Sequence, residues 1–196
     1  SPVFGGRIPS VVREKIEKLS GTGKKAVTIA VYGNRAYEDA LLEMNDILMK
    51  CGFTVIASGA FVAQHSMAPE VGAGRPDGED EKEIHKFAET VKNSTAVENV
   101  QVPGNRPYKP EMNMPVAPIS LLSCTKCGKC VTVCPTNAIS VADGAVITDT
   151  EKCILCMACT HVCTEQARIR PLPLQQKTEQ MLGALKGVRN KNEVFL

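Results

Sequence analysis

The chain has 196 residues and a formal charge of +2. This length fits one or two domains, and the near-balanced charge argues against a nucleic-acid binder driven by a basic surface. Aromatic residues make up 4% of the chain and Trp is absent, so we expect no stacking platform for bases. No apolar run approaches the roughly 18 residues of a membrane span, and no leader peptide is visible. We therefore expect a cytoplasmic protein with no nucleic-acid partner and no membrane span.

Residues 1–98 alternate between helical and strand-like patterns. Pro9 suits the first turn of a helix, and apolar residues follow it at helical spacing. Residues 26–31 (AVTIAV) resemble a strand buried on both faces, and residues 53–61 (FTVIASGAF) form the next predicted strand. An apolar stripe over residues 40–51 predicts the helix between them. A Gly-rich loop then leads to a helix whose inward residues are Ile84, Phe87, Ala88 and Val91.

This order of elements predicts half of a doubly wound α/β fold with a parallel sheet. Two strands cannot bury three amphipathic helices. The sequence also begins at Ser1 without Met, on what resembles the end of a buried strand. We therefore expect residues 1–98 to form a partial α/β domain that lacks its first strands because its N-terminal part is missing.

The region after residue 98 divides into three predicted segments. Residues 99–118 contain five prolines and are predicted to be a linker, since proline at this density disfavours helix and sheet. Residues 119–173 form a small cysteine-rich domain. Residues 174–196 are predicted to be a C-terminal helix, over about 175–188, and a tail.

Eight of the nine cysteines lie between Cys124 and Cys163, and only Cys51 lies outside, on an apolar stripe typical of a buried core thiol. Their clustering in an otherwise cytosolic composition favours metal binding over disulfides. The run CTKCGKCVTVCP starts at Cys124, and CILCMACTHVCT repeats its spacing 29 residues later. Structural zinc usually pairs C-x2-C units across a longer loop, so this C-x2-C-x2-C-x3-C spacing favours iron–sulfur clusters over zinc.

In this spacing the fourth cysteine of each run ligates the cluster of the other run. Three cysteines on a tight loop reach one cluster, whereas the fourth follows as the chain enters a short helix, and its sulfur points away. We assign one [4Fe–4S] cluster to Cys124, Cys127, Cys130 and Cys163. We assign the second to Cys153, Cys156, Cys159 and Cys134.

The cysteine domain is an internal duplication. Asp143-Gly144 predicts a hairpin between the runs, and ARIRP after the second run aligns with AISV after the first. A domain of about 55 residues has too small an apolar core, so the clusters are expected to stabilise it. Residues 119–170 resemble a bacterial two-[4Fe–4S] ferredoxin, which implies a small α+β ferredoxin-like fold.

The upstream region resembles a flavodoxin. SPVFGGRIP at residues 1–9 is similar to the loop after the third flavodoxin strand, and VYGNRAYEDAL at residues 31–41 to the loop after the fourth. Together with the cysteine half, they resemble the flavodoxin–ferredoxin fusion proteins of anaerobic bacteria. The resemblance implies FMN bound by Pro2, Val3, Phe4, Gly5, Gly6, Tyr32, Gly33, Asn34, Arg35 and Tyr37.

One flavodoxin feature is absent from this sequence. Flavodoxins hold the FMN phosphate on a loop after the first strand, and SGTGKK at residues 20–25 instead precedes a strand. We interpret SGTGKK as a helix cap and turn. FMN is therefore expected in the complete protein rather than in this chain alone.

The sequence predicts an electron carrier rather than an enzyme. No catalytic residue is needed, because the clusters supply the chemistry and the protein sets their position and potential. The expected partners are redox proteins, either a ferredoxin reductase or an oxidoreductase, and Lys126 and Lys129 beside the first cluster are candidates for steering them. Two alternatives stay open: an FMN-dependent oxidoreductase fed by its clusters, and a non-catalytic iron–sulfur redox sensor.

Overall fold

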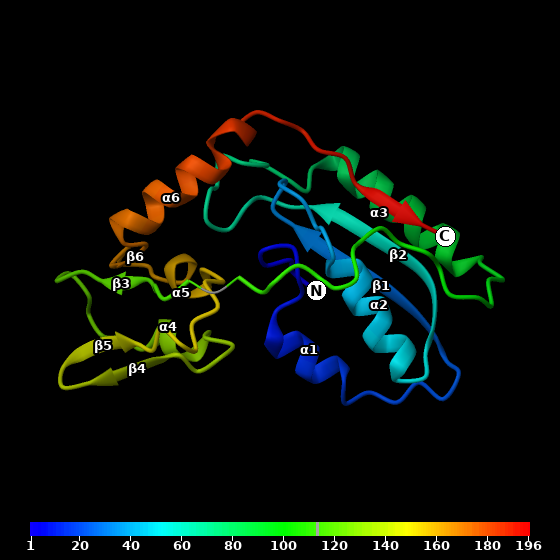
Figure 1. The fold of residues 1–196 in the computed structure, drawn as a ribbon. Helices are drawn as coiled ribbons and strands as arrows, with labels where there is room; N and C mark the ends of the chain where they lie inside the picture. The colour runs from blue at the N-terminus through cyan, green and yellow to red at the C-terminus, as the bar shows by residue number, and fades with distance from the viewer. Residues whose placement is uncertain (113) are drawn as a thin grey trace. The chain divides into compact units, whose positions relative to one another are not determined.

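The computed structural model describes residues 1–112 and 114–196, which form two compact units (Figure 1). The first unit combines Ser1–His65, Pro69–Met112 and Ala184–Leu196, and the second contains Ser66–Ala68 and residues 114–183. Across the described residues, no helix is both long and apolar enough to cross a membrane.

The helices and strands of the first unit are α1 (Ser10–Ile16), β1 (Lys25–Tyr32), α2 (Ala40–Lys50), β2 (Thr54–Val62), α3 (Gly78–Lys92) and β7 (Glu193–Phe195). A 3-10 turn, Gly183–Leu185, spans the point in the sequence where the second unit ends and the first resumes. Those of the second unit are β3 (Ile119–Ser120), α4 (Lys129–Thr132), β4 (Ile139–Ala142), β5 (Ala145–Thr148), α5 (Ala158–His161), β6 (Arg168–Ile169) and α6 (Leu172–Leu182).

The first unit is built on a small mixed sheet with the order β1-β2-β7. β1 and β2 are parallel, in register from Lys25 opposite Thr54 to Tyr32 opposite Val62. β7 pairs antiparallel with the other edge of β2. The parallel pair and its connecting helix confirm the α/β prediction, whereas the antiparallel edge strand was not predicted.

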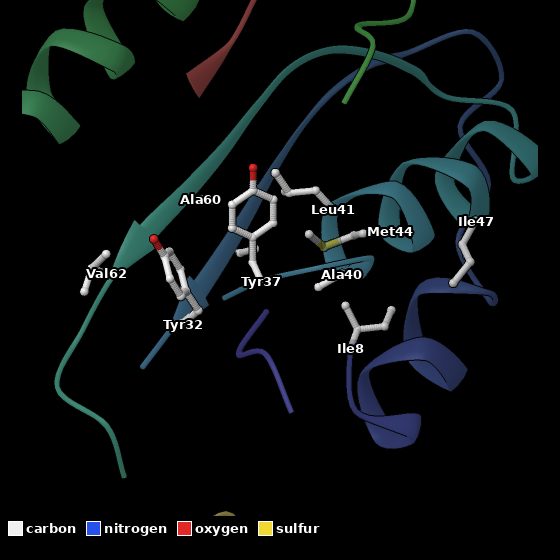
Figure 2. Packing of buried hydrophobic residues seen from close by; sticks show 10 residues of the cluster. Ile8, Tyr32, Tyr37, Ala40, Leu41, Met44, Ile47, Ala60 and Val62 are labelled. Carbon is white, nitrogen blue, oxygen red and sulfur yellow. The ribbon is translucent and has the colours of Figure 1, made fainter. Parts of the chain in front are cut away.

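Helices cover both faces of β2. Ala60 and Val62 pack with side chains of α2 and with Ile8 in one core cluster (Figure 2). Phe61, whose side chain points to the opposite face, packs edge-to-face on Phe87 of α3 with ring centroids 5.6 Å apart. β2 therefore lies between α2 and α3.

β1 is buried on one face only, which corrects the prediction that both faces are covered. Thr28, Ala30 and Tyr32 are buried, whereas alternate residues from Val27 to Val31 are about 40% exposed. The reason is that α3 packs against β2 and does not extend over β1. The apolar sequence of β1 thus predicts a strand correctly but overstates its burial.

The proline-rich segment forms no helix or strand over residues 99–112 and 114–118, as predicted. Its first part is nevertheless fastened to the first unit. Arg106 and Tyr108 both donate hydrogen bonds to the Asp46 carboxylate of α2, and the amides of Asn105 and Lys109 donate to Asp39. Residues 99–109 therefore behave as part of that unit rather than as a free linker.

The predicted C-terminal helix is shorter than expected. α6 ends at Leu182 and is followed by one 3-10 turn, instead of continuing to about residue 188. Gly187 then adopts a positive φ of 76°, which favours glycine and ends helical structure. The residues predicted as a tail form β7 and pair with β2 of the first unit.

The second unit repeats its local structure at the 29-residue offset of the cysteine runs. α4 and α5 have four residues each and occupy equivalent positions in the two runs. β4 and β5 form the predicted hairpin, and Asp143 and Gly144 both have positive φ, as its two-residue turn requires. β3 pairs antiparallel with β6 and brings the two ends of the unit together.

Candidate metal centre

Four cysteines from both runs line one hollow in the second unit. Cys124, Cys127 and Cys130 come from the first run, and Cys163 comes from the second. The hollow contains about 320 Å³ of space without protein atoms, part of it open to solvent. Thiols from two segments distant in the sequence therefore share one hollow, as the ligands of a cluster bound by both runs would.

The other four cysteines interact with one another. Burial raises the pKa of the Cys153 thiol, and the negative charges of Cys159, Cys156 and Cys134 raise it further. Burial likewise raises the pKa of Cys156, with smaller contributions from Cys159 and Cys134. The fourth cysteine of the first run therefore lies near the cysteines of the second run.

Backbone amides donate to the fourth cysteine of each run. The amide of Ala138 is 3.2 Å from Cys134 Sγ, and the amide of Ala167 is 3.3 Å from Cys163 Sγ. For Cys134, burial alone would raise the pKa, but hydrogen bonds from Thr136 and from nearby backbone amides outweigh it, and the pKa is lowered. These donors stabilise the thiolate form that iron requires.

The same strained backbone conformation occurs in both runs. Three pairs of residues at the 29-residue offset have similar positive φ values: Lys126 and Leu155 (58° and 56°), Gly128 and Met157 (79° and 63°), and Asn137 and Gln166 (52° and 51°). Left-handed residues outside glycine are uncommon and cluster at functional sites. Their repetition shows that both loops wrap their cysteines in the same way.

The donor set fits an iron–sulfur cluster. Among residues 1–112 and 114–196, no three Cys, His, Asp or Glu side chains converge as ligands of a single metal ion do. Four of the cysteines instead line one hollow, as the ligands of a multi-atom cluster do. Thiolates are the ligands that hold such clusters in proteins.

Comparison with known proteins identifies this unit. Residues 117–140 match the family model of a 4Fe-4S binding domain, and residues 150–166 match a second model with the same description. A ferredoxin-like protein of Haemophilus influenzae is 35% identical over 65 residues, which cover 30% of this chain and 76% of that protein. The chain belongs to the ferredoxin-like family.

A second relative is matched over a small part of its length. The polyferredoxin-like subunit of an aliphatic sulfonate oxidoreductase from Pyrococcus furiosus is 49% identical over 45 residues. The match covers 21% of this chain and 26% of that subunit. The ferredoxin-like unit is thus an iron–sulfur-binding domain, whose type is consistent with electron transfer.

A functional candidate in the ferredoxin-like unit was missed by the sequence analysis. Arg168 is 3% exposed, lines the hollow around Cys124, and has a buried Nε–H without a hydrogen-bond partner. The duplication carried a signal, because Arg168 occupies the position that Ile139 has in the first repeat. A charge in place of a core isoleucine is unusual.

The structure brings the two predicted flavin loops side by side in the first unit. Pro2 forms a parallel bridge with Val31, and the amide of Asp39 donates to Gly6 O. The two glycines, however, make room for protein side chains. A Cβ on Gly6 would lie 1.8 Å from Glu38 Oε2, and one on Gly5 would lie 2.8 Å from Met112 Cβ.

The predicted flavin contacts after β1 are held by the C-terminal segment. Tyr32 Oη donates to Lys191 O at 2.9 Å, Asn34 Nδ2 donates to Val188 O at 2.8 Å, and Tyr37 Oη donates to Glu193 Oε2 at 2.9 Å. All three residues are buried, and the two tyrosine rings pack edge-to-face (Figure 2). Their hydrogen-bonding groups are thus engaged by the protein itself.

The remaining predicted flavin residues each contact a different part of the first unit. Arg35 pairs with Glu38 at 2.8 Å, and Gly33 approaches the His65 side chain so closely that a Cβ would lie 2.6 Å from it. Phe4 closes a tight turn with Arg7 through two backbone hydrogen bonds. Arg35 and the two tyrosines also line a hollow together with Glu193.

Proposed function

We propose that the chain is a low-potential electron carrier that binds two [4Fe–4S] clusters and is not itself an enzyme. The observation that carries this proposal is the hollow lined by Cys124, Cys127, Cys130 and Cys163, because an exchange of the fourth ligand requires thiolates of both runs around one space. We assign the second cluster to Cys153, Cys156, Cys159 and Cys134. The mutual electrostatic influence of these four cysteines supports that assignment.

A bound [4Fe–4S] cluster supplies one-electron chemistry. The chain contributes the thiolates, the amides of Ala138 and Ala167 that stabilise two of them, and a partly buried setting in which Cys130 and Cys159 are shielded from water. Hydrogen bonds to sulfur and burial are the main determinants of cluster potential. No proton transfer or nucleophile is required of any side chain.

The partner is proposed to be an acidic redox protein, such as a ferredoxin reductase or an oxidoreductase. Lys126 and Lys129 are exposed and flank the exposed Cys127 at the mouth of the hollow. Such a pair attracts a negatively charged surface and speeds association at low salt. The relative from Pyrococcus furiosus, described as an oxidoreductase subunit, supports a role as a component of a larger electron-transfer system.

We also propose that FMN belongs to the complete protein, where a flavodoxin-like domain would exchange electrons with the clusters. Support comes from the resemblance of residues 1–9 and 31–41 to flavodoxin loops and from their side-by-side position. In this chain the C-terminal segment engages Tyr32, Asn34 and Tyr37. We therefore expect this chain to be purified without flavin.

The deciding experiment measures iron, acid-labile sulfide and flavin in the chain purified without oxygen. We expect about eight irons and eight sulfides, as two cubane clusters require, and no flavin. The reduced protein should also cycle reversibly with a ferredoxin reductase. Zinc in place of iron would refute the proposal.

Two further outcomes would favour the alternatives. Substrate turnover with bound FMN would indicate an oxidoreductase. A change in oligomeric state or partner affinity on cluster loss, without reversible cycling, would indicate a redox sensor.

A further inference from the structure

Arg168 is a buried charge without a carboxylate among its hydrogen-bond partners. It is 3% exposed, its Nη1 donates to Ser120 Oγ at 3.0 Å, and its Nη2 donates to Thr148 Oγ1 at 2.7 Å. Both partners are neutral hydroxyl groups. Its Nε–H is buried and has no partner. A buried cation normally requires an anion, and a buried donor requires an acceptor.

Arg168 lies close to cysteine sulfurs of both proposed cluster sites, and Glu165 lines the same hollow. Arg168 lines the hollow that contains Cys130, and its Nη2 lies 3.9 Å from Cys159 Sγ. The guanidinium therefore lies between the two cysteine sets.

We propose that Arg168 is the shared counter-charge of both cluster sites and that it donates its Nε–H to sulfur in the hollow of Cys124, Cys127, Cys130 and Cys163. The inference rests on the proposed two-cluster function. A cluster with four thiolates is anionic, and reduction adds a further negative charge. A buried cation and a hydrogen bond to sulfur both stabilise the reduced form more than the oxidised form. Arg168 should therefore raise the reduction potential.

The chain provides a matched control at Arg170, two residues along. Arg170 carries the same charge but is only half-buried, and its guanidinium donates to the backbone oxygen of Met67. It is not among the residues that line the cysteine hollow. Arg168→Met and Arg170→Met thus remove the same net charge, and only the first removes the cation beside the cysteines.

The test is an electron paramagnetic resonance redox titration of the wild-type protein and of Arg168→Met, Arg168→Lys and Arg170→Met. Arg168→Met should shift the reduction equilibrium of at least one cluster at least tenfold toward the oxidised form, which is about 59 mV for one electron. Arg168→Lys should recover part of the shift because it keeps the charge. Arg170→Met should change the equilibrium less than about twofold, since a partly exposed charge is screened. Equal potentials in Arg168→Met and Arg170→Met, with both clusters present, would overturn the inference.

A milder pair of variants covers the case in which Arg168→Met fails to assemble clusters. Ser120→Ala and Thr148→Val keep the cation and remove one anchoring hydroxyl each. Combined, they should shift the reduction equilibrium about two- to threefold toward the oxidised form, the same direction as Arg168→Met. An unchanged potential in this double variant would then overturn the inference.

Failure of the inference and failure of the proposed function are distinguishable in the same samples. Wild-type protein without iron and sulfide refutes the two-cluster function, and the role of Arg168 is then refuted with it. Wild-type protein with two reversible clusters, whose potentials do not depend on Arg168, refutes only the inference.

Discussion

Two double substitutions test the exchange of the fourth cysteine by counting iron. If Cys134 shares a cluster with Cys153, then Cys134→Ala together with Cys153→Ala disrupts one site, and about four irons remain of about eight. Under the same arrangement, Cys134→Ala together with Cys124→Ala disrupts both sites, and almost no iron remains. Without exchange, the two outcomes are reversed. The comparison works because two substitutions in one site remove a single cluster, whereas substitutions in different sites remove both.

The structure favours a cluster shared by Cys134 and Cys153. Cys134 does not line the hollow of Cys124, which instead contains Cys163 from the second run. Cys134 influences the titration of Cys153 and Cys156. The amide of Ala138 also donates a hydrogen bond to Cys134 Sγ, with an N–S distance of 3.2 Å.

The assay is iron and sulfide analysis of protein purified without oxygen, with far-ultraviolet circular dichroism to monitor folding. Cys51→Ala is the control, because Cys51 lies outside the cysteine runs and its thiol donates to the backbone oxygens of Ile16 and Glu17. It should keep all eight or so irons. About four irons in Cys134→Ala/Cys124→Ala, with almost none in Cys134→Ala/Cys153→Ala, would refute the exchange.

Three further predictions concern stability. Glu43→Ala should lower the unfolding free energy in urea by about 3 kcal/mol, because it removes a buried carboxylate that accepts two hydrogen bonds from the half-buried Arg7. Glu111→Ala, at an exposed ion pair, should cost less than about 1 kcal/mol. Hydrogen bonds from the Arg75 guanidinium hold the pKa of Asp80 far below its ordinary value of about 3.9. The stability that this pair contributes is therefore complete above that pH and is lost as the pH falls below it. Thermal unfolding across acidic pH should show this loss of stability, and Asp80→Asn should abolish it. Gly187→Ala should lower stability by only about 1 kcal/mol, because φ is 76° but no described protein atom lies within 4 Å of the added Cβ; a drop of several kcal/mol would contradict this.

Local signals made the second unit largely predictable. The repeated cysteine spacing constrains both loops, and the Asp143-Gly144 turn determines the hairpin between them. Because the second run repeats the first at a fixed offset, the backbone of one loop predicts that of the other. The ligand sets themselves stay a prediction until iron is measured.

Long-range pairing explains what the sequence analysis did not predict in the first unit. Residues 193–195 join β2 across more than 130 positions, and no local pattern indicates which edge a three-residue strand will use. Tyr32 and Asn34 then hydrogen-bond the returning segment, although their loop position resembles that of flavin contacts. Aromatic and amide side chains suit either role, and the neighbouring segment decides between them.

The two halves of the duplication have diverged in a way that makes the sites unequal. Cys163 brings Ala167 and Arg168 with it to the first hollow, because all three lie on one short segment of the second repeat. Cys134 brings the equivalent Ala138 to the other cysteine set, but Ile139 stands where the second repeat has Arg168. If the fourth ligand is exchanged as we propose, a backbone donor is exchanged with it, and a cation from the second repeat joins the wall of the first hollow. Nη2 of Arg168 approaches Cys159, but we expect the larger effect at the first hollow, because Arg168 lines it and has an Nε–H free to donate to sulfur. We therefore expect the cluster of Cys124, Cys127, Cys130 and Cys163 to have the higher potential, and Arg168→Met to narrow the gap between the two.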